Sequence, residues 1–273
     1  MSETKVAPPP PVTPNTSGFY SQNVLWVHHW TDAYFSFAIT RPPGFRFRSG
    51  EFVMIGLPAE PKPIMRAYSI ASPAYSDTLE FFSIKVADGP LTSRLQRIEP
   101  GHEILLGRKS TGTLVLDALK PGRRLWLVAT GTGLAPWLAV ARDPDAYDHF
   151  EKIIVAHTVR GVQDLAYRTL LEEGIREDEL LGDLVGETLR YYPTVSREPF
   201  KYPGRFADRL RNGECFRDLG LNLTDLSPTE DRVMLCGSMA MIKEIAAELQ
   251  AKGFSEGSNA EPGDFVIERA FVG

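Results

Sequence analysis

Leu125-Trp-Leu-Val-Ala-Thr-Gly-Thr-Gly-Leu-Ala-Pro136 is the stretch that decides the fold. Its first six residues form an apolar run that is typical of a buried strand. Gly131-Thr-Gly133 follows as a turn, and Pro136 suits the first helical turn, where its missing N–H has no partner anyway. A buried strand, a glycine turn and a helix start form the layout that receives a dinucleotide phosphate. Proline replaces the third glycine of the full fingerprint, so the motif depends on this context.

The chain after Lys120-Pro-Gly122 alternates between strands and helices. Helical stretches, including residues 163–173 and 239–252, separate apolar runs at residues 125–129, 153–156, 189–192 and 233–236. Such alternation predicts a parallel sheet covered on both faces. We therefore expect an α/β Rossmann-like domain over residues 119–273.

The preceding part of the chain has a different pattern, with short strand-like runs bounded by Gly, Pro and Asp. The clearest runs are residues 34–39, 52–55 and 79–86. Frequent turn signals between short strands predict a closed antiparallel β-barrel over residues 19–118. One helix is expected from about residue 91 to 98. Residues 1–18 are rich in Pro, Thr and Ser and are expected to form a disordered or extended tail.

Arg66-Ala-Tyr-Ser69 lies in an apolar run, residues 64–70, that is typical of a strand. Alternation along a strand places Arg66 and Tyr68 on the same face. Arginine binds phosphate bidentately, and tyrosine offers a ring face with a polar tip. Together they suit a flat aromatic ring system joined to a phosphate, while the Ser69 hydroxyl can donate to a ring nitrogen. A half-buried strand with a surface arginine is the simpler alternative.

A second phosphate-binding signal is Gly89-Pro-Leu-Thr-Ser93, which precedes the expected helix. Gly89 permits a tight turn. The backbone N–H groups that follow it, with the hydroxyls of Thr92 and Ser93, can hold a pyrophosphate at a helix N-terminus. An ordinary Thr or Ser helix cap is the alternative.

These residues together resemble the ferredoxin/flavodoxin–NADP reductase family, and the likeness runs from residue 19 to the C-terminus. Further matching stretches, in the family's order, are Phe81-Phe-Ser-Ile-Lys-Val86, Cys236-Gly-Ser-Met239 and Glu268-Arg-Ala-Phe-Val-Gly273. The resemblance implies that the barrel holds FAD and the α/β domain holds NADP(H). It also implies hydride transfer between nicotinamide C4 and flavin N5, followed by single-electron steps to ferredoxin or flavodoxin.

The resemblance also implies roles for individual residues. Those expected to contact FAD are Arg66, Ala67, Tyr68, Ser69, Phe82, Ile84, Lys85, Val86, Gly89, Pro90, Leu91, Thr92, Ser93, Thr132 and Phe271. Those expected to contact NADP are Gly131, Thr132, Gly133, Arg160, Thr194, Ser196, Arg197, Arg205, Cys236, Gly237, Ser238 and Met239. Ser69, Cys236, Glu268 and Ala270 are expected at the reaction centre, with Cys236 shaping it rather than acting as a thiolate. Ala270 replaces a flavin-covering aromatic of the plant-type enzymes, so shielding of the nicotinamide face is left open.

Basic and hydroxyl groups at the expected strand ends favour NADP over NAD. Arg160 follows one strand, Ser196 and Arg197 follow the next, and Arg205 comes shortly after. No acidic residue is expected at these ends to bind a free ribose diol, whereas arginines there favour a 2′-phosphate. A solvated loop carrying arginines is the alternative.

Composition excludes several other classes of protein. With 43% hydrophobic and 24% charged residues, no apolar stretch long enough to span a bilayer and no visible signal peptide, we expect a cytoplasmic protein. A net charge of -5 gives no argument for nucleic-acid binding. Two cysteines cannot ligate an iron–sulfur cluster, and the five histidines show no metal-binding spacing.

The partner is expected to be a ferredoxin or flavodoxin that docks transiently through charge on a monomeric enzyme. Basic residues in the barrel half that suit an acidic carrier are Arg46, Arg48, Arg94, Arg97, Arg108 and Lys109. Two alternative functions are an NADPH-dependent reductase component of an oxygenase system and a non-catalytic flavin or nucleotide sensor. An NADPH-dependent dye-reduction assay distinguishes the sensor from an enzyme.

Overall fold

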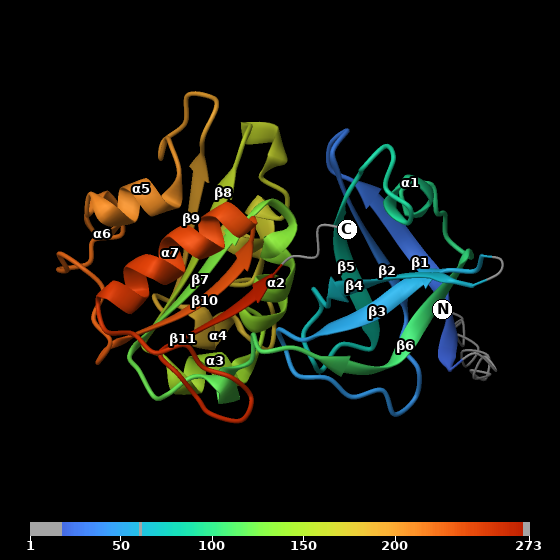
Figure 1. The fold of residues 1–273 in the computed structure, drawn as a ribbon, viewed down its shortest axis with the longest axis horizontal. Helices are drawn as coiled ribbons and strands as arrows, with labels where there is room; N and C mark the ends of the chain where they lie inside the picture. Colours follow the sequence, from blue (N-terminus) through green and yellow to red (C-terminus); the bar gives the residue numbers. More distant parts are fainter. Residues whose placement is uncertain (1–17, 60–61, 270–273) are drawn as a thin grey trace, which may run out of the picture.

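The computed structural model describes residues 18–59 and 62–269 and contains two sheets that lie side by side (Figure 1). The residues expected to form the tail up to Ser17, and the expected site residues Ala270 and Phe271, lie outside the described residues. No helix in the described part of the chain has the length and apolar character needed to cross a membrane.

The first sheet is antiparallel and contains six strands in the order β4-β3-β6-β1-β2-β5. Their bounds are β1 Phe19–His29, β2 Tyr34–Thr40, β3 Phe52–Leu57, β4 Ile64–Ser69, β5 Thr78–Ile84 and β6 Glu103–Thr111. An antiparallel bridge between Ile70 and Phe81 joins the two edge strands, β4 and β5. The sheet is thereby closed, and the predicted barrel is confirmed. Its interior is filled by apolar side chains that include Phe35, Phe37 and Phe81.

Two elements of the barrel half differ from the sequence expectation. The strand predicted over residues 79–86 ends at Ile84, because a turn begins within the segment that leads to Gly89. The expected helix is the short α1, Thr92–Leu95. Sequence analysis named no strand at β6, where a short apolar run is followed by exposed polar residues.

The second sheet is parallel and contains five strands in the order β11-β10-β7-β8-β9. Their bounds are β7 Arg124–Thr130, β8 Lys152–Val159, β9 Leu189–Val195, β10 Asp231–Gly237 and β11 Phe265–Arg269. The chain runs outward from β7 to β9 and then returns to β10 on the other side of β7. The strand order therefore reverses between β7 and β10, and the crevice at their carboxyl ends is where parallel sheets bind ligands.

Both faces of this sheet are covered, as the sequence predicts. The helices are α2 Ala135–Val140, α3 Pro144–His149, α4 Gly182–Val185, α5 Phe206–Arg211, α6 Glu214–Asp218 and α7 Met239–Ala251. Alternate residues of β7 belong to different clusters: Leu125 and Leu127 pack with Leu138 of α2, whereas Trp126 packs with Ile245 of α7. The period-2 alternation of a strand thus divides one continuous apolar run between two cores.

The predicted helix over residues 163–173 is wrong. The chain forms a 3-10 turn at Val162–Asp164 and a separate π-helical turn at Leu170–Gly174. Tyr167, between them, has a φ of 59°, which a continuous right-handed helix does not permit. Its side chain reaches the barrel, where its hydroxyl bonds to Ser36 and Glu80. A tertiary contact therefore overrides the local helical preference.

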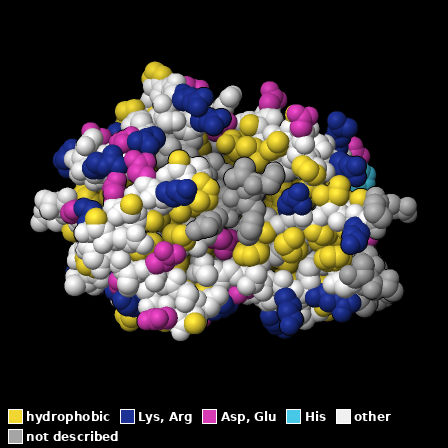
Figure 2. Space-filling view, viewed as in Figure 1, with side chains coloured by type: hydrophobic (Ala, Val, Ile, Leu, Met, Phe, Trp, Pro, Cys, Tyr) yellow, Lys and Arg dark blue, Asp and Glu magenta, His cyan; other side chains and the backbone are white. Residues whose placement is uncertain are grey.

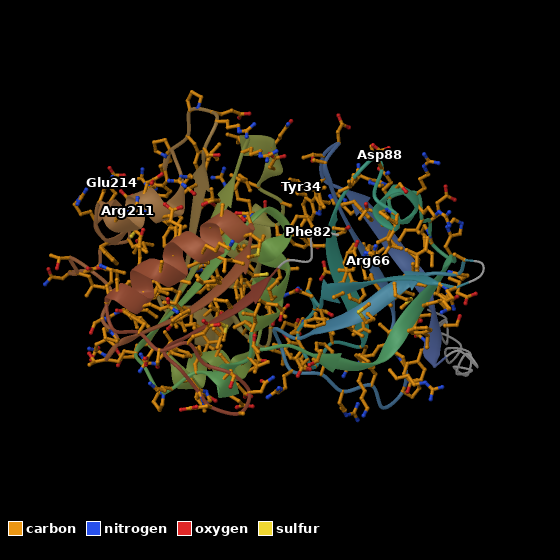
Figure 3. The ribbon with its side chains drawn as sticks, viewed as in Figure 1. Tyr34, Arg66, Phe82, Asp88, Arg211 and Glu214 are labelled. Atoms are coloured by element: carbon orange, nitrogen blue, oxygen red, sulfur yellow. The ribbon has the colours of Figure 1, made fainter. Side chains whose placement is uncertain are left out.

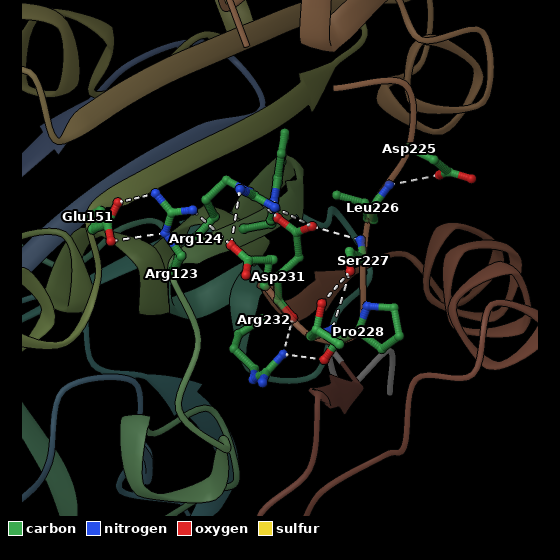
Figure 4. A network of polar contacts seen from close by, with 12 residues as sticks. Arg123, Arg124, Glu151, Asp225, Leu226, Ser227, Pro228, Asp231 and Arg232 are labelled. Carbon is green, nitrogen blue, oxygen red and sulfur yellow. Dashed lines mark hydrogen bonds and ion pairs between the residues drawn. The ribbon is translucent and has the colours of Figure 1, made fainter. Parts of the chain in front are cut away.

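A buried ion pair joins β7 to β10 at the ends of the strands far from the crevice (Figure 4). Arg124 Nε donates to Asp231 Oδ1 over 2.7 Å, and Trp126 Nε1 donates to the same oxygen over 2.9 Å. The Ser227 N–H donates to Asp231 Oδ2 over 2.7 Å. The carboxylate, with no exposed surface, is therefore fully supplied with donors.

The same figure includes an exposed pair, Arg123 with Glu151, whose side chains are 57% and 63% exposed. Exposed ion pairs contribute little to stability because water screens the charges and the side chains lose entropy. Asp231, which is buried, and Glu151, which is exposed, can therefore be compared by substitution to measure the effect of burial on stability.

We expect Asp231→Ala to lower the free energy of unfolding by about 3 kcal/mol, because it removes the main partner of the largely buried Arg124 guanidinium and leaves two other donors without an acceptor. Glu151→Ala should leave the unfolding midpoint nearly unchanged. Chemical denaturation followed by circular dichroism measures both. Equal effects from the two substitutions would show that burial of the Asp231 pair does not matter for stability.

Candidate active-site cleft

A cleft that is partly open to solvent, with about 980 Å³ of empty space when the adjoining solvent is included, lies where the barrel meets the carboxyl ends of the parallel strands. It brings together many of the residues singled out from the sequence. Those on the barrel side are Arg66, Ala67, Tyr68, Ser69, Phe82, Ile84, Val86, Gly89, Pro90, Leu91 and Thr92. Those on the parallel-sheet side are Thr132, Gly133, Cys236 and Glu268. Phe52, Ser83 and Ala135 also line the cleft, although no sequence motif predicted them.

Strand β4 lines the cleft with four consecutive residues, Arg66, Ala67, Tyr68 and Ser69. The Tyr68 hydroxyl lies 3.1 Å from Ser83 Oγ of β5, and its ring meets Phe81 edge-on at 6.3 Å. Burial raises the pKa of Tyr68, while its hydrogen bond to Ser83 opposes that shift. The ring is therefore held by a neutral hydroxyl, and its position suits stacking against a flat ligand. Figure 3 labels Arg66 on the barrel and Phe82 at the side that faces the parallel sheet.

The turn before α1 is as tight as the sequence suggests. A Cβ atom on Gly89 would lie 2.1 Å from Thr92 Oγ1 and 3.2 Å from Val86 Cβ, so a larger residue there would require the Thr92 side chain to move. The Thr92 hydroxyl bonds to the Val86 carbonyl over 3.3 Å, and the Ser93 N–H donates to the Gly89 carbonyl over 3.1 Å. Gly89 to Thr92 line the cleft, whereas Ser93 does not. A half-buried arginine, an aromatic face and a glycine turn on one wall fit a flavin nucleotide with its phosphates.

Lys85 does not line the cleft either. Its ammonium donates to the Thr31 carbonyl over 2.7 Å, which directs it away from the ligand site. Lys85 follows the last residue of β5, Ile84, so it lies in the segment that leads to Gly89 rather than on the strand.

The glycine turn after β7 packs directly on the end of β10. A Cβ atom on Gly133 would lie 2.4 Å from the Cys236 carbonyl oxygen, and one on Gly237 would lie 2.8 Å from the Thr130 backbone nitrogen. Ser238 donates from its N–H to Thr130 Oγ1 over 2.7 Å and caps α7 through its hydroxyl, which accepts from the Met241 N–H. These contacts require glycines because the two chain segments touch through their backbones. Gly131, Gly237, Ser238 and Met239 adjoin the cleft without lining it.

A buried histidine, His157, forms a hydrogen bond to this turn, and no role for it was predicted from the sequence. His157 Nε2 lies 3.0 Å from the Gly131 carbonyl, and Nδ1 lies 3.1 Å from the Tyr191 hydroxyl. Burial lowers the pKa of His157 to about 4, so the ring is neutral at pH 7. Nε2–H then donates to Gly131, and Nδ1 accepts from Tyr191. Nothing in the apolar run around His157 signals this contact, which depends on the β7–β8 register.

Cys236 and Glu268 are neighbours across the parallel pair β10–β11. Burial raises the pKa of the Cys236 thiol, so it is protonated at neutral pH, in agreement with a shaping role. Glu268 is 9% exposed, and among the described residues its Oε2 has no hydrogen-bond partner. Burial raises the pKa of Glu268 to about 8, against a hydrogen bond from the Thr113 backbone. An unpartnered buried oxygen beside a thiol fits a ligand that brings its own polar groups, such as an amide-bearing ring.

The arginines at the strand ends differ in their environment. Arg160 and Arg197 are exposed side by side after β8 and β9, because the Arg197 N–H donates to the Arg160 carbonyl over 3.0 Å. Ser196 is also exposed, and its hydroxyl bonds to the Val159 carbonyl. Within the described residues, neither guanidinium is recorded in an ion pair. These two side chains fit a phosphate group.

Three expectations about this rim need correction. Arg205 forms ion pairs with Asp208 and Glu244 at 2.7 and 2.9 Å, so its charge is already compensated. Thr194 has no exposed surface, and its hydroxyl lies 2.8 Å from that of Thr158. Acidic residues do occur at the strand ends: Glu198 accepts from the Val162 N–H and Asp164 from the Gly161 N–H, each over 3.0 Å. These carboxylates accept hydrogen bonds from the loop backbone after β8, so acidic groups as well as basic ones occur at the strand ends.

Comparisons with known proteins agree with this geometry. Residues 127–247 match the family model described as Oxidoreductase NAD-binding domain. The chain is 54% identical over 256 residues to Ferredoxin–NADP reductase A of Sorangium cellulosum, covering 94% of this chain and 91% of that protein. It is 52% identical to the Flavodoxin/ferredoxin–NADP reductase of Rhodobacter capsulatus, covering 100% of this chain and 99% of that protein.

A solved structure is also similar. It is a ferredoxin NADP+ reductase from Neisseria gonorrhoeae with bound FAD and NADP, 30% identical, with a TM-score of 0.83. The likeness covers 93% of this chain and 99% of that one.

Glu268 should make stability depend on pH. Its pKa is raised from 4.5 to about 8, so its contribution is fully present below pH 4.5 and is lost as pH rises through 8. We expect the unfolding free energy of the wild type, minus that of Glu268→Gln, to fall between pH 5.5 and 8.5. Urea denaturation of both proteins across this range measures the difference. Parallel pH profiles would mean that the carboxyl is not buried in the folded protein.

Proposed function

The chain belongs to the ferredoxin/flavodoxin–NADP reductase family, and from this premise we propose that it is an FAD-containing oxidoreductase that transfers electrons between NADP(H) and a ferredoxin or flavodoxin. The observation that carries the proposal is the composition of one cleft. Tyr68 and Ser69 line its barrel wall, and Gly133, Cys236 and Glu268 line its opposite wall. A flavin site and a nicotinamide site therefore share one cavity.

FAD, when bound, accepts a hydride from NADPH and returns single electrons, so the cofactor supplies the redox chemistry. The protein supplies binding and orientation. We propose that Arg66 and the Gly89–Thr92 turn bind the flavin phosphates, while Tyr68 stacks on the ring and Ser69 faces its reactive edge. The domain boundary near residue 118 is part of the same proposal, with residues 19–118 holding FAD and residues 119–273 holding NADP(H).

The parallel-sheet half is proposed to orient the nucleotide. The Gly131–Gly133 turn receives the pyrophosphate, because its backbone lies at the reversal point of the sheet. Cys236 and Glu268 flank the nicotinamide as neutral groups, so neither places an anion beside the ring. Arg160 and Arg197 bind the 2′-phosphate. Thr194 and Arg205 are not part of this contact set, since one is buried and the other is paired.

The partner is proposed to dock transiently on the barrel half through charge. Figure 2 shows several Lys and Arg side chains on the visible face of that half. Arg46, Arg94, Arg97, Arg108 and Lys109 are exposed. Arg48 is different, because it pairs with Glu51 and Asp117 at 3.1 and 3.2 Å. Complementary charge would speed the encounter with an acidic carrier.

We also propose that the enzyme is a monomer and is cytoplasmic. Each half has a core of its own, and residues from both halves of one chain line the cleft. Sedimentation of the holoenzyme tests the first statement, and a dimer that persists on dilution would contradict it. Recovery of the protein from the membrane fraction or from outside the cytoplasm would contradict the second.

The purified protein should be yellow and should release FAD, not FMN, on denaturation, as identified by chromatography. NADPH should then reduce the bound flavin, and ferredoxin or flavodoxin should reoxidise it. Titration with candidate carriers identifies the preferred one. A colourless protein that cannot be reconstituted would refute the proposal, while tight ligand binding with poor dye reduction would favour the sensor. Preference for a ferredoxin that serves an oxygenase would favour the reductase-component alternative.

Arg197→Ala should raise the KM for NADPH roughly ten- to a hundredfold. A hydrogen bond to a charged group contributes about 1.5–3 kcal/mol, and about 1.4 kcal/mol is a factor of ten. The KM and kcat for NADH should stay unchanged, because NADH has no 2′-phosphate. The kcat at saturating NADPH should also stay unchanged. Arg205→Ala is the matched control and should have a smaller effect, since that arginine is already paired. Equal losses with NADH and NADPH would mean that Arg197 supports the fold.

Raising the ionic strength should slow reduction of an acidic ferredoxin more than reduction of ferricyanide. Screening acts over about 8 Å at physiological salt, so it weakens the attraction between two charged protein surfaces. Steady-state rates with both acceptors over a salt series measure the contrast. The same salt dependence for both acceptors would remove the docking proposal.

A further inference from the structure

A buried polar contact joins the two halves beside the cleft, and it centres on Glu80 of β5. The side chains of Glu80 and Arg142 are only 13% and 17% exposed. Arg142, which follows α2, places Nη2 3.2 Å from Glu80 Oε2 and 2.7 Å from the Ala71 carbonyl. Tyr167, which follows β8, places its hydroxyl 2.7 Å from Glu80 Oε1. Each carboxylate oxygen therefore receives a donor from a different segment of the parallel-sheet half.

The Tyr167 hydroxyl also lies 2.6 Å from Ser36 Oγ of β2, and Trp30 Nε1 donates to that Ser36 oxygen over 2.7 Å. An ionised carboxylate only accepts, and a hydroxyl has one proton to donate. Tyr167 therefore donates to Glu80 and accepts from Ser36, which in turn accepts from Trp30. These hydrogen bonds therefore connect Trp30 and Ser36 of the barrel to Tyr167, and Tyr167 to Glu80, which is again in the barrel.

The backbone of Tyr167 indicates that this contact is enforced. Its φ of 59° is the only positive value at a non-glycine position in the described part of the chain. Its ring is 6% exposed and packs against Trp30 and Phe82, with centroids 4.6 and 5.4 Å away. A strained backbone conformation persists only where surrounding contacts over-determine it, and such positions cluster at functional sites.

The contact connects directly to the walls of the cleft. Glu80 and Phe82 are two residues apart on β5 and so share a face, and Phe82 lines the cleft. Arg142 lies just beyond α2, the helix that continues from the Gly131–Leu134 turn. Tyr34 adds a bridge, because its ring packs on Phe82 and its hydroxyl approaches Gly131. Figure 3 shows Tyr34 and Phe82 close together where the two halves meet.

We propose that Glu80, Arg142 and Tyr167 form an interdomain clamp that holds the flavin wall and the nucleotide wall of the cleft at the spacing required for hydride transfer. The proposal rests on the proposed function. All three are positioning residues: they act through Phe82 and α2, and none of them lines the cleft. Loss of the clamp should therefore slow the reaction between two bound ligands without weakening the binding of either.

Tyr167→Phe tests the clamp because it removes the hydroxyl and keeps the ring. In the holoenzyme, stopped-flow reduction of the flavin by saturating NADPH should slow about ten- to a hundredfold, since small misplacements of reacting groups cost that much. The variant should retain FAD as the wild type does, and its Kd for NADPH should be unchanged. Hydrogen exchange of the apoprotein should become faster in the peptides that contain β5 and the Gly131–Leu134 turn.

Tyr147→Phe is the matched control. Its hydroxyl donates to the Ala141 carbonyl over 2.6 Å, within the parallel-sheet half alone. It should change neither the rate of flavin reduction nor hydrogen exchange at the interface. If Tyr167→Phe does not fold, Glu80→Gln takes its place, because it keeps the side-chain shape but weakens both interdomain contacts.

Several results would overturn the clamp. They are wild-type rates and wild-type exchange in Tyr167→Phe or Glu80→Gln, effects equal to those of the control, or a raised Kd for NADPH with an unchanged limiting rate. A wild-type flavin that NADPH does not reduce would refute the proposed function instead. The hydrogen-exchange comparison of the apoproteins would then still decide whether the contact holds the two halves together.

Discussion

The backbone contact between the ends of β7 and β10 is the constraint on which the site depends. Gly133 lies so close to the Cys236 carbonyl that a single added carbon would clash, and Gly237 makes the reciprocal approach to Thr130. This contact exists only because β10 returns to the side of β7 opposite β8. It brings the glycine turn and Cys236 to one point at the carboxyl edge of the sheet, where the barrel then supplies the second wall.

The buried ionisable groups around the cleft are neutral, and the exposed arginines at its edge are charged. Burial raises the pKa values of the cleft-lining groups Tyr68, Cys236 and Glu268, and it lowers that of His157, which lies behind the Gly131 turn, so all four are shifted toward their uncharged forms. Arginines, in contrast, stand where water still reaches them. A redox cofactor that changes charge during turnover would meet little fixed charge near its ring, while its phosphates would meet cations at the edge.

Stability and function occupy opposite ends of the parallel sheet. The Asp231 network fastens the amino ends of β7 and β10, and Arg232 bonds to the Lys120 carbonyl in the segment that joins the two halves. The carboxyl ends carry glycines, exposed arginines and a carboxylate oxygen that has no hydrogen-bond partner among residues 18–59 and 62–269. Hydrogen bonds hold the strands together at their amino ends. The carboxyl ends can therefore keep polar groups that are left for a ligand to bond.

The sequence by itself determined the two sheets, the strand–turn–helix unit after Leu125 and the placement of Arg66 and Tyr68 on one strand face, because period and turn chemistry are local properties. It also identified the family. Only the tertiary structure decided that Thr194 is buried, that Arg205 is paired, that Tyr167 breaks a predicted helix and that His157 supports Gly131. Each of these outcomes involves a partner distant in sequence, although Arg205 also pairs with Asp208, three residues along the chain. Strand order and register bring such partners together, and no local pattern encodes them.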